Sequence, residues 1–201
     1  MASDNLSWDT FYQKIQGRAS RPLVLAVLKA FEEDISQNDS RQAIDLGCGD
    51  GTETLELLSR SWNVLAVDAE PGAIKRLLDK LSEAHRAHLQ TQIAKFEEVS
   101  LVPADLIHAS FSIPFCKPEH FDTFWKKIVA AIKPGGRFAG QLFGINDSWA
   151  DNPDMTFQTT GQVHELFKDF EIESFQEQDE DGEAVSGPKH WHVFMVIARK
   201  K

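Results

Sequence analysis

The chain is poor in cysteine, in basic residues and in long apolar runs. Its two cysteines, Cys48 and Cys116, are too few for a disulfide framework and fit reduced thiols in the cytoplasm. Acidic residues outnumber basic ones, 31 to 21, and the net charge of −10 argues against a nucleic-acid partner, because no basic run offsets it. No stretch approaches the ~18 consecutive apolar residues of a membrane span, and residues 1–9 lack the apolar core of a signal peptide. These absences predict a cytoplasmic protein that is neither exported nor membrane-bound.

The composition is that of an ordinary folded protein, 42% hydrophobic and 26% charged, and 201 residues suffice for a single domain over residues 1–201. Helices and strands are expected to alternate along it, with turn residues between them. The expected helices are 22–35, 52–61, 71–86, 121–132 and 161–167, and the expected strands are 43–46, 63–67, 88–93, 105–109, 137–143, 171–176 and 190–198. This alternation predicts an α/β fold with a parallel sheet between two layers of helices.

The most informative segment is AIDLGCGDGT, residues 43–52. Its apolar strand is followed by three glycines at alternate positions, which let the backbone turn tightly and let a ligand approach it. The next expected strand ends before Asp68, 21 positions after Gly47. A carboxylate at that place can accept hydrogen bonds from both hydroxyls of a ribose. The glycine turn and the spaced acid together predict a cofactor that contains a nucleoside.

Charge favours one cofactor over another. The turn is surrounded by the carboxylates of Asp45, Asp50 and Glu53. They would repel the pyrophosphate that a dinucleotide places at a helix N-terminus. They suit S-adenosylmethionine, which has no phosphate and carries an ammonium and a sulfonium. In addition, Thr52 stands where the third glycine of a dinucleotide-binding motif is expected. We therefore expect S-adenosylmethionine.

The segment from Asp45 to Gly51, taken with Asp68, resembles motifs I and II of the class I S-adenosylmethionine-dependent methyltransferases. Residues 133–137 resemble the loop that precedes strand five in that family. The resemblance implies a Rossmann-like, doubly wound and mostly parallel seven-stranded sheet with an antiparallel last strand and helices on both faces. The layout most resembles the compact bacterial tellurite-resistance and thiopurine type, which implies a small-molecule acceptor.

The resemblance also assigns residues to the cofactor. The turn and the end of the second strand would hold the methionine and ribose parts, residues 95–98 would pack against the adenine, and the end of the fourth strand would face the methyl donor. The residues so implied are Asp45, Gly47, Cys48, Gly49, Asp68, Ala69, Phe96, Glu97 and Ser110. Cys48 is expected to contribute backbone contacts, because nothing in its setting activates a thiolate.

An N-terminal segment, residues 1–20, is a candidate lid. Trp8, Phe11 and Tyr12 share one face of an expected helix, and aromatic faces attract cations such as a sulfonium. Arg18 would then meet the carboxylate of the methionine part. The alternative is an amphipathic helix that merely docks on the core, and the sequence leaves both interpretations open.

The acceptor is expected at the carboxyl ends of the parallel strands, where open α/β sheets bind ligands. Residues 111–116, 144–160 and 177–192 should meet there, with Phe111, Trp149, His190 and His192 as candidate pocket residues. Either histidine could accept a proton, bind the acceptor or simply pack in the strand, and Trp149 could simply anchor its loop. No further ligand set accompanies the H-x-H pair, so no metal is expected. The acidic run 177–183 is expected to be a solvated hairpin turn.

The sequence thus predicts a methyltransferase that passes the sulfonium methyl by in-line displacement to a small molecule, acting as a monomer or homodimer without nucleic acid or membrane. Holding donor and acceptor in line supplies most of the acceleration, so no catalytic side chain is demanded. A non-catalytic S-adenosylmethionine-binding or protein-partner module is the first alternative. An NAD-dependent oxidoreductase is the second.

Overall fold

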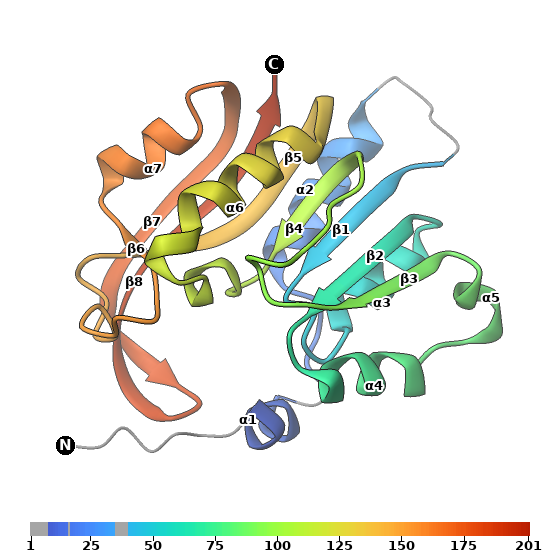
Figure 1. Cartoon of the computed structure of the whole chain (residues 1–201), viewed down its shortest axis with the longest axis horizontal. Coiled ribbons are helices and arrows are strands. Elements are labelled where there is room, and N and C mark those ends of the chain that lie inside the picture. Colours follow the sequence, from blue (N-terminus) through green and yellow to red (C-terminus); the bar gives the residue numbers. More distant parts are fainter. Residues whose placement is uncertain (1–7, 16, 35–39) are drawn as a thin grey trace.

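The computed structural model describes residues 8–15, 17–34 and 40–201. Its helices and strands alternate as the sequence predicts (Figure 1). In chain order the elements are α1 (Trp8–Lys14), α2 (Pro22–Glu33), β1 (Gln42–Leu46), α3 (Thr52–Ser59), β2 (Asn63–Asp68), α4 (Pro71–Asp79), α5 (Glu83–Arg86), β3 (Leu89–Ile93), β4 (Ala104–Ala109), η1 (Ile113–Phe115), α6 (Pro118–Ala131), β5 (Ile132–Gly144), β6 (Phe157–Gln158), α7 (Thr160–Leu166), β7 (Phe170–Ala184) and β8 (Gly187–Lys200).

The strands form one sheet in the order β3-β2-β1-β4-β5-β8-β7. β1 to β5 pair in parallel, whereas β8 runs antiparallel to β5 and to β7. The expected seven-stranded, mostly parallel sheet with an antiparallel last strand is confirmed. An eighth, two-residue strand, β6, pairs with β5 inside the segment predicted to be a polar loop.

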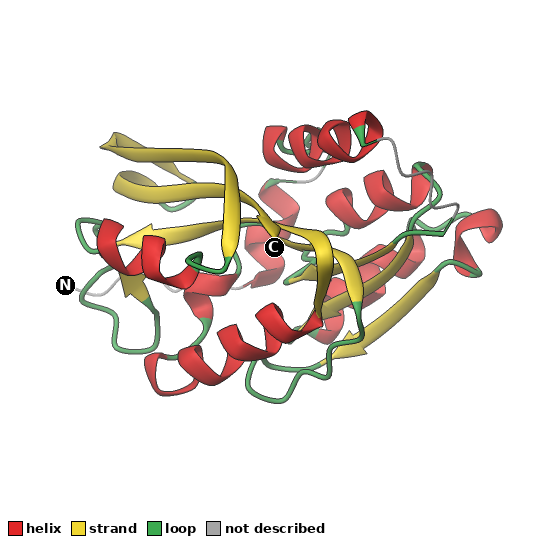
Figure 2. Cartoon of the chain, turned by 90° about the horizontal axis from the view of Figure 1, so that it is seen from above, coloured by secondary structure: helices red, strands yellow, loops and turns green. Residues whose placement is uncertain are grey.

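Helices cover both faces of the sheet (Figure 2). Side chains alternate along each strand, so neighbouring residues enter different layers. Ala43 packs with apolar residues of α2 and α3, while Ile44 packs with those of α6 and α7. The inner strands β1, β2, β4 and β5 are therefore buried on both sides, and their carboxyl ends form the edge where a ligand can bind.

The helix expected over residues 71–86 is two helices, so that prediction is wrong. α4 ends at Asp79, and Ser82 before α5 has an extended backbone with ψ of 155°. Lys80 turns back toward the glycine turn, where its Nζ donates to the carbonyl of Asp50 at 2.7 Å. The apolar spacing of Leu77, Leu78 and Leu81 continues through this break, so the sequence pattern did not reveal it.

The prediction that residues 177–183 form a solvated turn is also wrong, because they belong to β7. β7 and β8 continue as a paired hairpin as far as Ala184 and Gly187, so the turn lies at Val185 and Ser186. Cross-strand contacts compensate for the acidic side chains, for example between Asp179 and His190. The helix expected to reach Ile35 ends at Glu33, and Ile35 itself lies outside the described residues.

Candidate functional site: the glycine turn and the carboxyl edge of the sheet

The glycine turn after β1 has the backbone that only glycine adopts readily. Gly47, Gly49 and Gly51 all have positive φ angles, of 69°, 56° and 79°. The amides of Gly47 and Cys48 both donate to the carbonyl of Val67 in β2, at 2.8 and 2.9 Å. The turn is thereby fixed to the end of the neighbouring strand.

Asp68 joins the two sequence motifs. Its Oδ2 accepts a hydrogen bond from the amide of Gly49 at 2.9 Å, and its Oδ1 accepts one from the amide of Glu70. Burial raises the pKa of this carboxyl above its ordinary value. Ala69 follows it on the surface. The acid expected at the ribose position therefore lies directly beside the glycine turn.

Helix α1 lies against the same turn. The ring of Tyr12 is buried there, and a Cβ placed on Gly49 would be 2.9 Å from its Cε1. Trp8 stacks on Tyr12 with a centroid distance of 5.9 Å, and Phe11 packs edge-on against both. Burial and the nearby Asp68 raise the pKa of the Tyr12 hydroxyl. The aromatic face expected on this helix is thus turned toward the turn.

Arg18 is engaged by carboxylates of the turn. Its guanidinium pairs with Glu53 through both terminal nitrogens and with Asp50 at 3.2 Å. Lys80 also reaches Asp50, at 3.5 Å. The acids of the turn are therefore partly neutralised by Arg18, which was expected to meet a cofactor carboxylate, and by Lys80, which the sequence pattern did not identify. A cofactor carboxylate that met Arg18 would share it with Glu53.

Asp45 is buried and bonded on both oxygens. Oδ2 accepts from the hydroxyl of Thr54 at 2.6 Å, and Oδ1 lies 3.0 Å from Nδ1 of His108. Cys48 is buried beside it, and burial, together with the nearby Asp45 and Asp68, keeps the pKa of the Cys48 thiol well above its ordinary value. A thiolate nucleophile is therefore disfavoured at Cys48, in line with the expectation of backbone contacts only.

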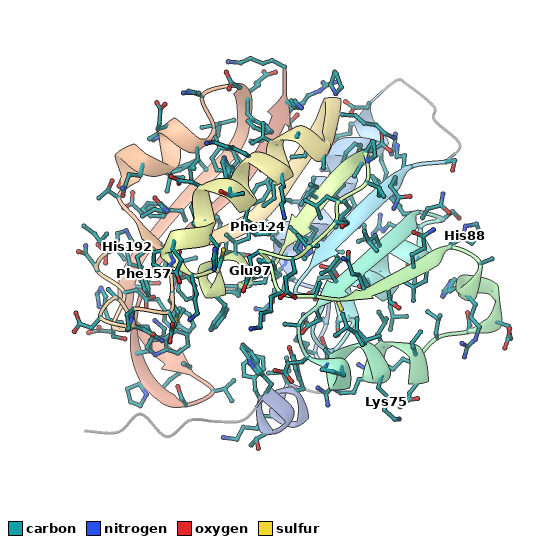
Figure 3. The ribbon with its side chains drawn as sticks, in the orientation of Figure 1. Lys75, His88, Glu97, Phe124, Phe157 and His192 are labelled. Carbon is teal, nitrogen blue, oxygen red and sulfur yellow. The ribbon has the colours of Figure 1, made fainter. Side chains whose placement is uncertain are left out.

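The segment expected to face the adenine lies between β3 and β4. Phe96 stacks on Phe124 of α6 at 4.7 Å, so its ring is part of the core on that side. The carbonyl of Glu97 accepts a hydrogen bond from Lys127 (Figure 3). At the end of β4, the hydroxyl of Ser110 is buried and has no hydrogen-bond partner among the described residues. An orphaned hydroxyl at this edge is available to a ligand.

Four aromatic residues, which we call the aromatic cluster, gather where β4, β5 and β8 meet. Phe111 contacts Phe143 and Trp191 with centroid distances of 6.1 and 6.0 Å, and Trp149 contacts both Phe143 and Trp191. Phe111, Trp149 and Trp191 remain partly exposed. Two of the expected acceptor-pocket residues, Phe111 and Trp149, thus belong to one surface.

Sequence reasoning missed the buried cation beneath this cluster. The ammonium of Lys189 pairs with Asp147 and lies 4.2 and 4.3 Å from the ring centroids of Trp149 and Trp191. Asp147 also accepts from the amide of Trp149 at 3.0 Å. The polar sequence Lys-His-Trp-His at residues 189–192 gave no sign that Lys189 is buried. The anchored-loop interpretation of Trp149 gains a structural basis.

The two histidines lie farther along the hairpin. His192 is buried, accepts from the amide of Asn146 through Nδ1, and contacts Glu177 through Nε2 at 3.0 Å (Figure 3). His190 contacts Asp179 and Asp181 of β7. The ring of His190 is therefore engaged within the hairpin, and that of His192 is shared between the hairpin and the loop after β5. Across residues 8–15, 17–34 and 40–201, no three His, Cys, Asp or Glu side chains are arranged so that they could hold a metal ion.

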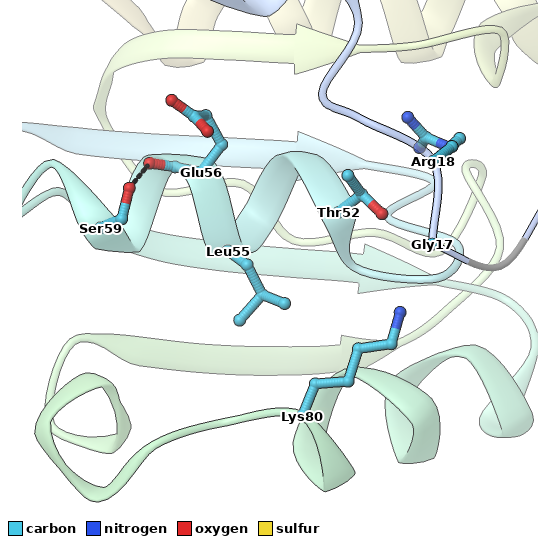
Figure 4. Close-up of a pocket in the computed structure, with 7 residues that line it drawn as sticks. All are labelled: Gly17, Arg18, Thr52, Leu55, Glu56, Ser59 and Lys80. Atoms are coloured by element: carbon cyan, nitrogen blue, oxygen red, sulfur yellow. Dashed lines mark hydrogen bonds between the residues drawn. The ribbon is translucent and has the colours of Figure 1, made fainter.

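A pocket beside the site opens on the outer side of α3 (Figure 4). Neither Gly49 nor Asp68 lines it, so it is separate from the contact between these two residues. Its lining residues are Gly17, Arg18, Thr52, Leu55, Glu56, Ser59 and Lys80.

No helix within the described part of the chain is long and apolar enough to cross a membrane.

The comparisons with known proteins agree with this geometry. Residues 43–136 match the family model described as a methyltransferase domain. Over 167 residues the chain is 27% identical to a carboxy-S-adenosyl-L-methionine synthase of Erwinia tasmaniensis, which covers 80% of this chain and 63% of that protein. The chain spans less than two thirds of the length of this and the other such synthases that it matches.

Two solved structures share the fold. TehB from Haemophilus influenzae superposes with a TM-score of 0.76 at 20% identity, covering 96% of this chain and 66% of that one. The 1,6-didemethyltoxoflavin-N1-methyltransferase of Burkholderia thailandensis gives a TM-score of 0.68 at 20% identity, covering 98% and 84%. Residues 43–136 therefore match the model of a methyltransferase domain, and the chain has the fold of these two solved structures.

Proposed function

We propose that the chain transfers a methyl group from S-adenosylmethionine to a small-molecule acceptor. The observation that carries this proposal is the hydrogen bond between the Gly49 amide and Oδ2 of Asp68, at 2.9 Å. It unites a turn that permits close backbone approach with an acid suited to ribose hydroxyls. The match of residues 43–136 to a methyltransferase domain supports it.

The residues fit this cofactor on two counts. The backbone of Gly49 is bonded to Asp68 and carries no side chain, with the ring of Tyr12 as its cover, and the buried Ser110 hydroxyl lacks a partner among the described residues. We assign residues of the glycine turn and of the strand ends to the methionine and ribose parts, namely Asp45, Gly47, Cys48, Gly49, Asp68, Ala69 and Ser110. We assign Phe96 and Glu97 to the adenine, and Trp8, Tyr12 and Arg18 to the cover over the bound cofactor.

Bound S-adenosylmethionine supplies an electrophilic methyl on a sulfonium, so the side chains have little covalent work to do. The glycine turn and Asp68 would orient the donor, and α1 would exclude water from it. The ring of Tyr12 already has the guanidinium of Arg76 4.6 Å from its centroid, so the ring of Trp8 is the one that would stabilise the positive charge of the donor. The partly exposed rings of Phe111 and Trp149 hold the acceptor at the end of β4 and β5. Alignment of the two reactants then supplies most of the acceleration.

We further propose that residues 1–201 act as one domain with residues 1–20 as its lid, in the cytoplasm, as a monomer or homodimer. One sheet includes strands from residue 42 to residue 200, which supports a single folding unit. Both cysteines are free and buried, as suits a reducing compartment.

Calorimetric titration of the purified chain with S-adenosylmethionine, S-adenosylhomocysteine and NADH tests the proposal. We expect micromolar affinity for the first two and none for NADH. Release of S-adenosylhomocysteine in the presence of a panel of small molecules then separates an enzyme from a binding module. Binding of NADH alone would overturn the proposal.

A further inference from the structure

Arg21 lies at the exit of β4 with its guanidinium on an aromatic ring. Its Cζ is 4.7 Å from the ring centroid of Phe111. Phe111 is held in place by its backbone, because its amide donates to Oε1 of Gln141 at 3.1 Å and its φ is +52°, rare for a bulky residue. The amide of Arg21 itself donates to Glu53. The backbones of Arg21 and Phe111 are thus each held by a hydrogen bond to a third residue, Glu53 and Gln141 respectively.

The guanidinium of Arg21 has no carboxylate partner among the described residues. Its Nε is buried without a hydrogen bond. The nearest acids, Glu53 and Asp50, are already engaged by Arg18, and Asp50 also by Lys80. A buried Nε–H without an acceptor leaves hydrogen-bonding capacity of this cation unused, which is costly.

The aromatic cluster is not a free binding site for a positively charged methyl acceptor. Lys189 already lies over the rings of Phe143, Trp149 and Trp191, and it is paired with Asp147. This site for a cation is therefore filled from within. A second positive group brought to Phe111 would be repelled by Arg21.

An anionic acceptor would instead be attracted by the positive charge of Arg21. A carboxylate accepts two parallel hydrogen bonds from a guanidinium, in a planar geometry that fixes its orientation. Beside Arg21, the partly exposed rings of Phe111 and Trp191 offer contact for a flat apolar group. Desolvation by burial and the neighbouring Arg18 lower the pKa of Arg21, and an anion would reverse this cost.

We propose that Arg21 selects a methyl acceptor that carries a carboxylate on a flat apolar body, with the acid on the guanidinium and the body against Phe111 and Trp191. This inference rests on the proposed function and names its class of substrate. Arg21 acts as a specificity residue, because it binds the acceptor and not the methyl group in transit.

Matched acid and amide probes test the proposal. Salicylate with salicylamide, and anthranilate with anthranilamide, each place a nucleophilic atom beside either a carboxylate or its neutral counterpart. Titrations with S-adenosylhomocysteine present measure affinity, and S-adenosylhomocysteine release measures transfer. For the unaltered chain we expect the acids to bind about ten- to a hundredfold better than the amides, the range for hydrogen bonds to charged groups.

Arg21→Gln should remove this preference and leave affinity for S-adenosylhomocysteine unchanged, while Arg21→Lys should keep part of it. Arg41→Gln is the matched control, because Arg41 also stacks on aromatic rings, those of Phe31 and Trp62, away from the carboxyl edge. Thermal unfolding checks that each variant is folded.

Equal binding of acids and amides, or no binding of either acid, would overturn this inference while normal S-adenosylhomocysteine binding leaves the proposed function standing. Loss of S-adenosylhomocysteine affinity in Arg21→Gln would also overturn it, since Arg21 would then belong to the donor. Failure of the unaltered chain to bind S-adenosylmethionine would overturn both.

Discussion

The ring of Tyr12 occupies the space that a side chain on Gly49 would need. A Cβ at residue 49 would lie 2.9 Å from Cε1 of Tyr12, closer than side chains pack. The contact joins α1 to the glycine turn, which lies far along the chain. It follows that residue 49 must be glycine for two reasons, the left-handed backbone and the packing of the helix above it.

Gly49→Val should abolish binding of S-adenosylmethionine while the chain stays folded. A β-branched residue is strongly disfavoured at a φ of +56°, and its side chain would displace Tyr12. Calorimetry measures the binding, and amide hydrogen exchange in α1 measures the displacement. Gly161→Ala is the control, because nothing lies within 4 Å of a Cβ there. Normal binding by Gly49→Val would show that the turn does not hold the cofactor.

Asp68→Ala should weaken binding of S-adenosylhomocysteine by about 1–3 kcal/mol, or about five- to 150-fold, because ribose hydroxyls lose their acceptor. Asp79→Ala should change nothing, since Asp79 lies on the exposed side of α4, where it pairs with Lys75. If both variants bind equally well, Asp68 does not contact the ribose.

The same carboxylate predicts a pH dependence of binding. Burial raises the pKa of Asp68 above its ordinary 3.8, and an acceptor of two hydroxyl hydrogens must be ionised. Affinity should therefore fall as the pH drops through this raised pKa, at a higher pH than for an exposed aspartate. Titration of the chain with S-adenosylhomocysteine between pH 7 and 4 checks this, and a flat profile would contradict it.

His190 should stabilise the hairpin of β7 and β8 in a pH-dependent way. Hydrogen bonds to Asp179 and then Asp181 raise its pKa above the ordinary 6.5. A raised folded-state pKa gives stability that is complete below 6.5 and is lost as the pH rises through the folded value. NMR titration measures the pKa of His190, which Asp179→Asn should lower. Glu180→Gln, on the same strand but paired across to Trp191, should not lower it.

The buried pair of Lys189 and Asp147 predicts non-additive stability. Asp147→Ala should cost about 3–5 kcal/mol, because it leaves the ammonium buried without a counter-charge. Adding Lys189→Met should recover part of this loss, since an apolar side chain suits the surrounding rings. Urea unfolding of both single variants and the double variant measures the coupling. Strict additivity would mean that the two charges do not depend on each other.

Local sequence patterns predicted most of the helices and strands correctly. They failed where contacts between segments far apart in the sequence determine the structure. The strand, glycine turn and helix of residues 43–59 are confirmed because each follows from nearest-neighbour chemistry. The break between α4 and α5 was missed, because apolar spacing continues past Asp79 and gives no sign of the long-range contact between Lys80 and Asp50 beside it. The extent of β7 was missed for the same reason, because cross-strand partners keep its acidic residues paired.

The sequence by itself determined the order of helices and strands, the glycine turn and the acid at Asp68, because apolar periodicity and backbone freedom act over a few residues. Only the tertiary structure decided which charges remain without a partner. Arg18 is neutralised by Glu53, Lys189 is buried against Asp147, and the guanidinium of Arg21 meets an aromatic ring but no carboxylate in the part of the chain that the structure describes. Pairing of charges depends on distance in space and on exclusion of water, and neither is written in the spacing of residues along a chain.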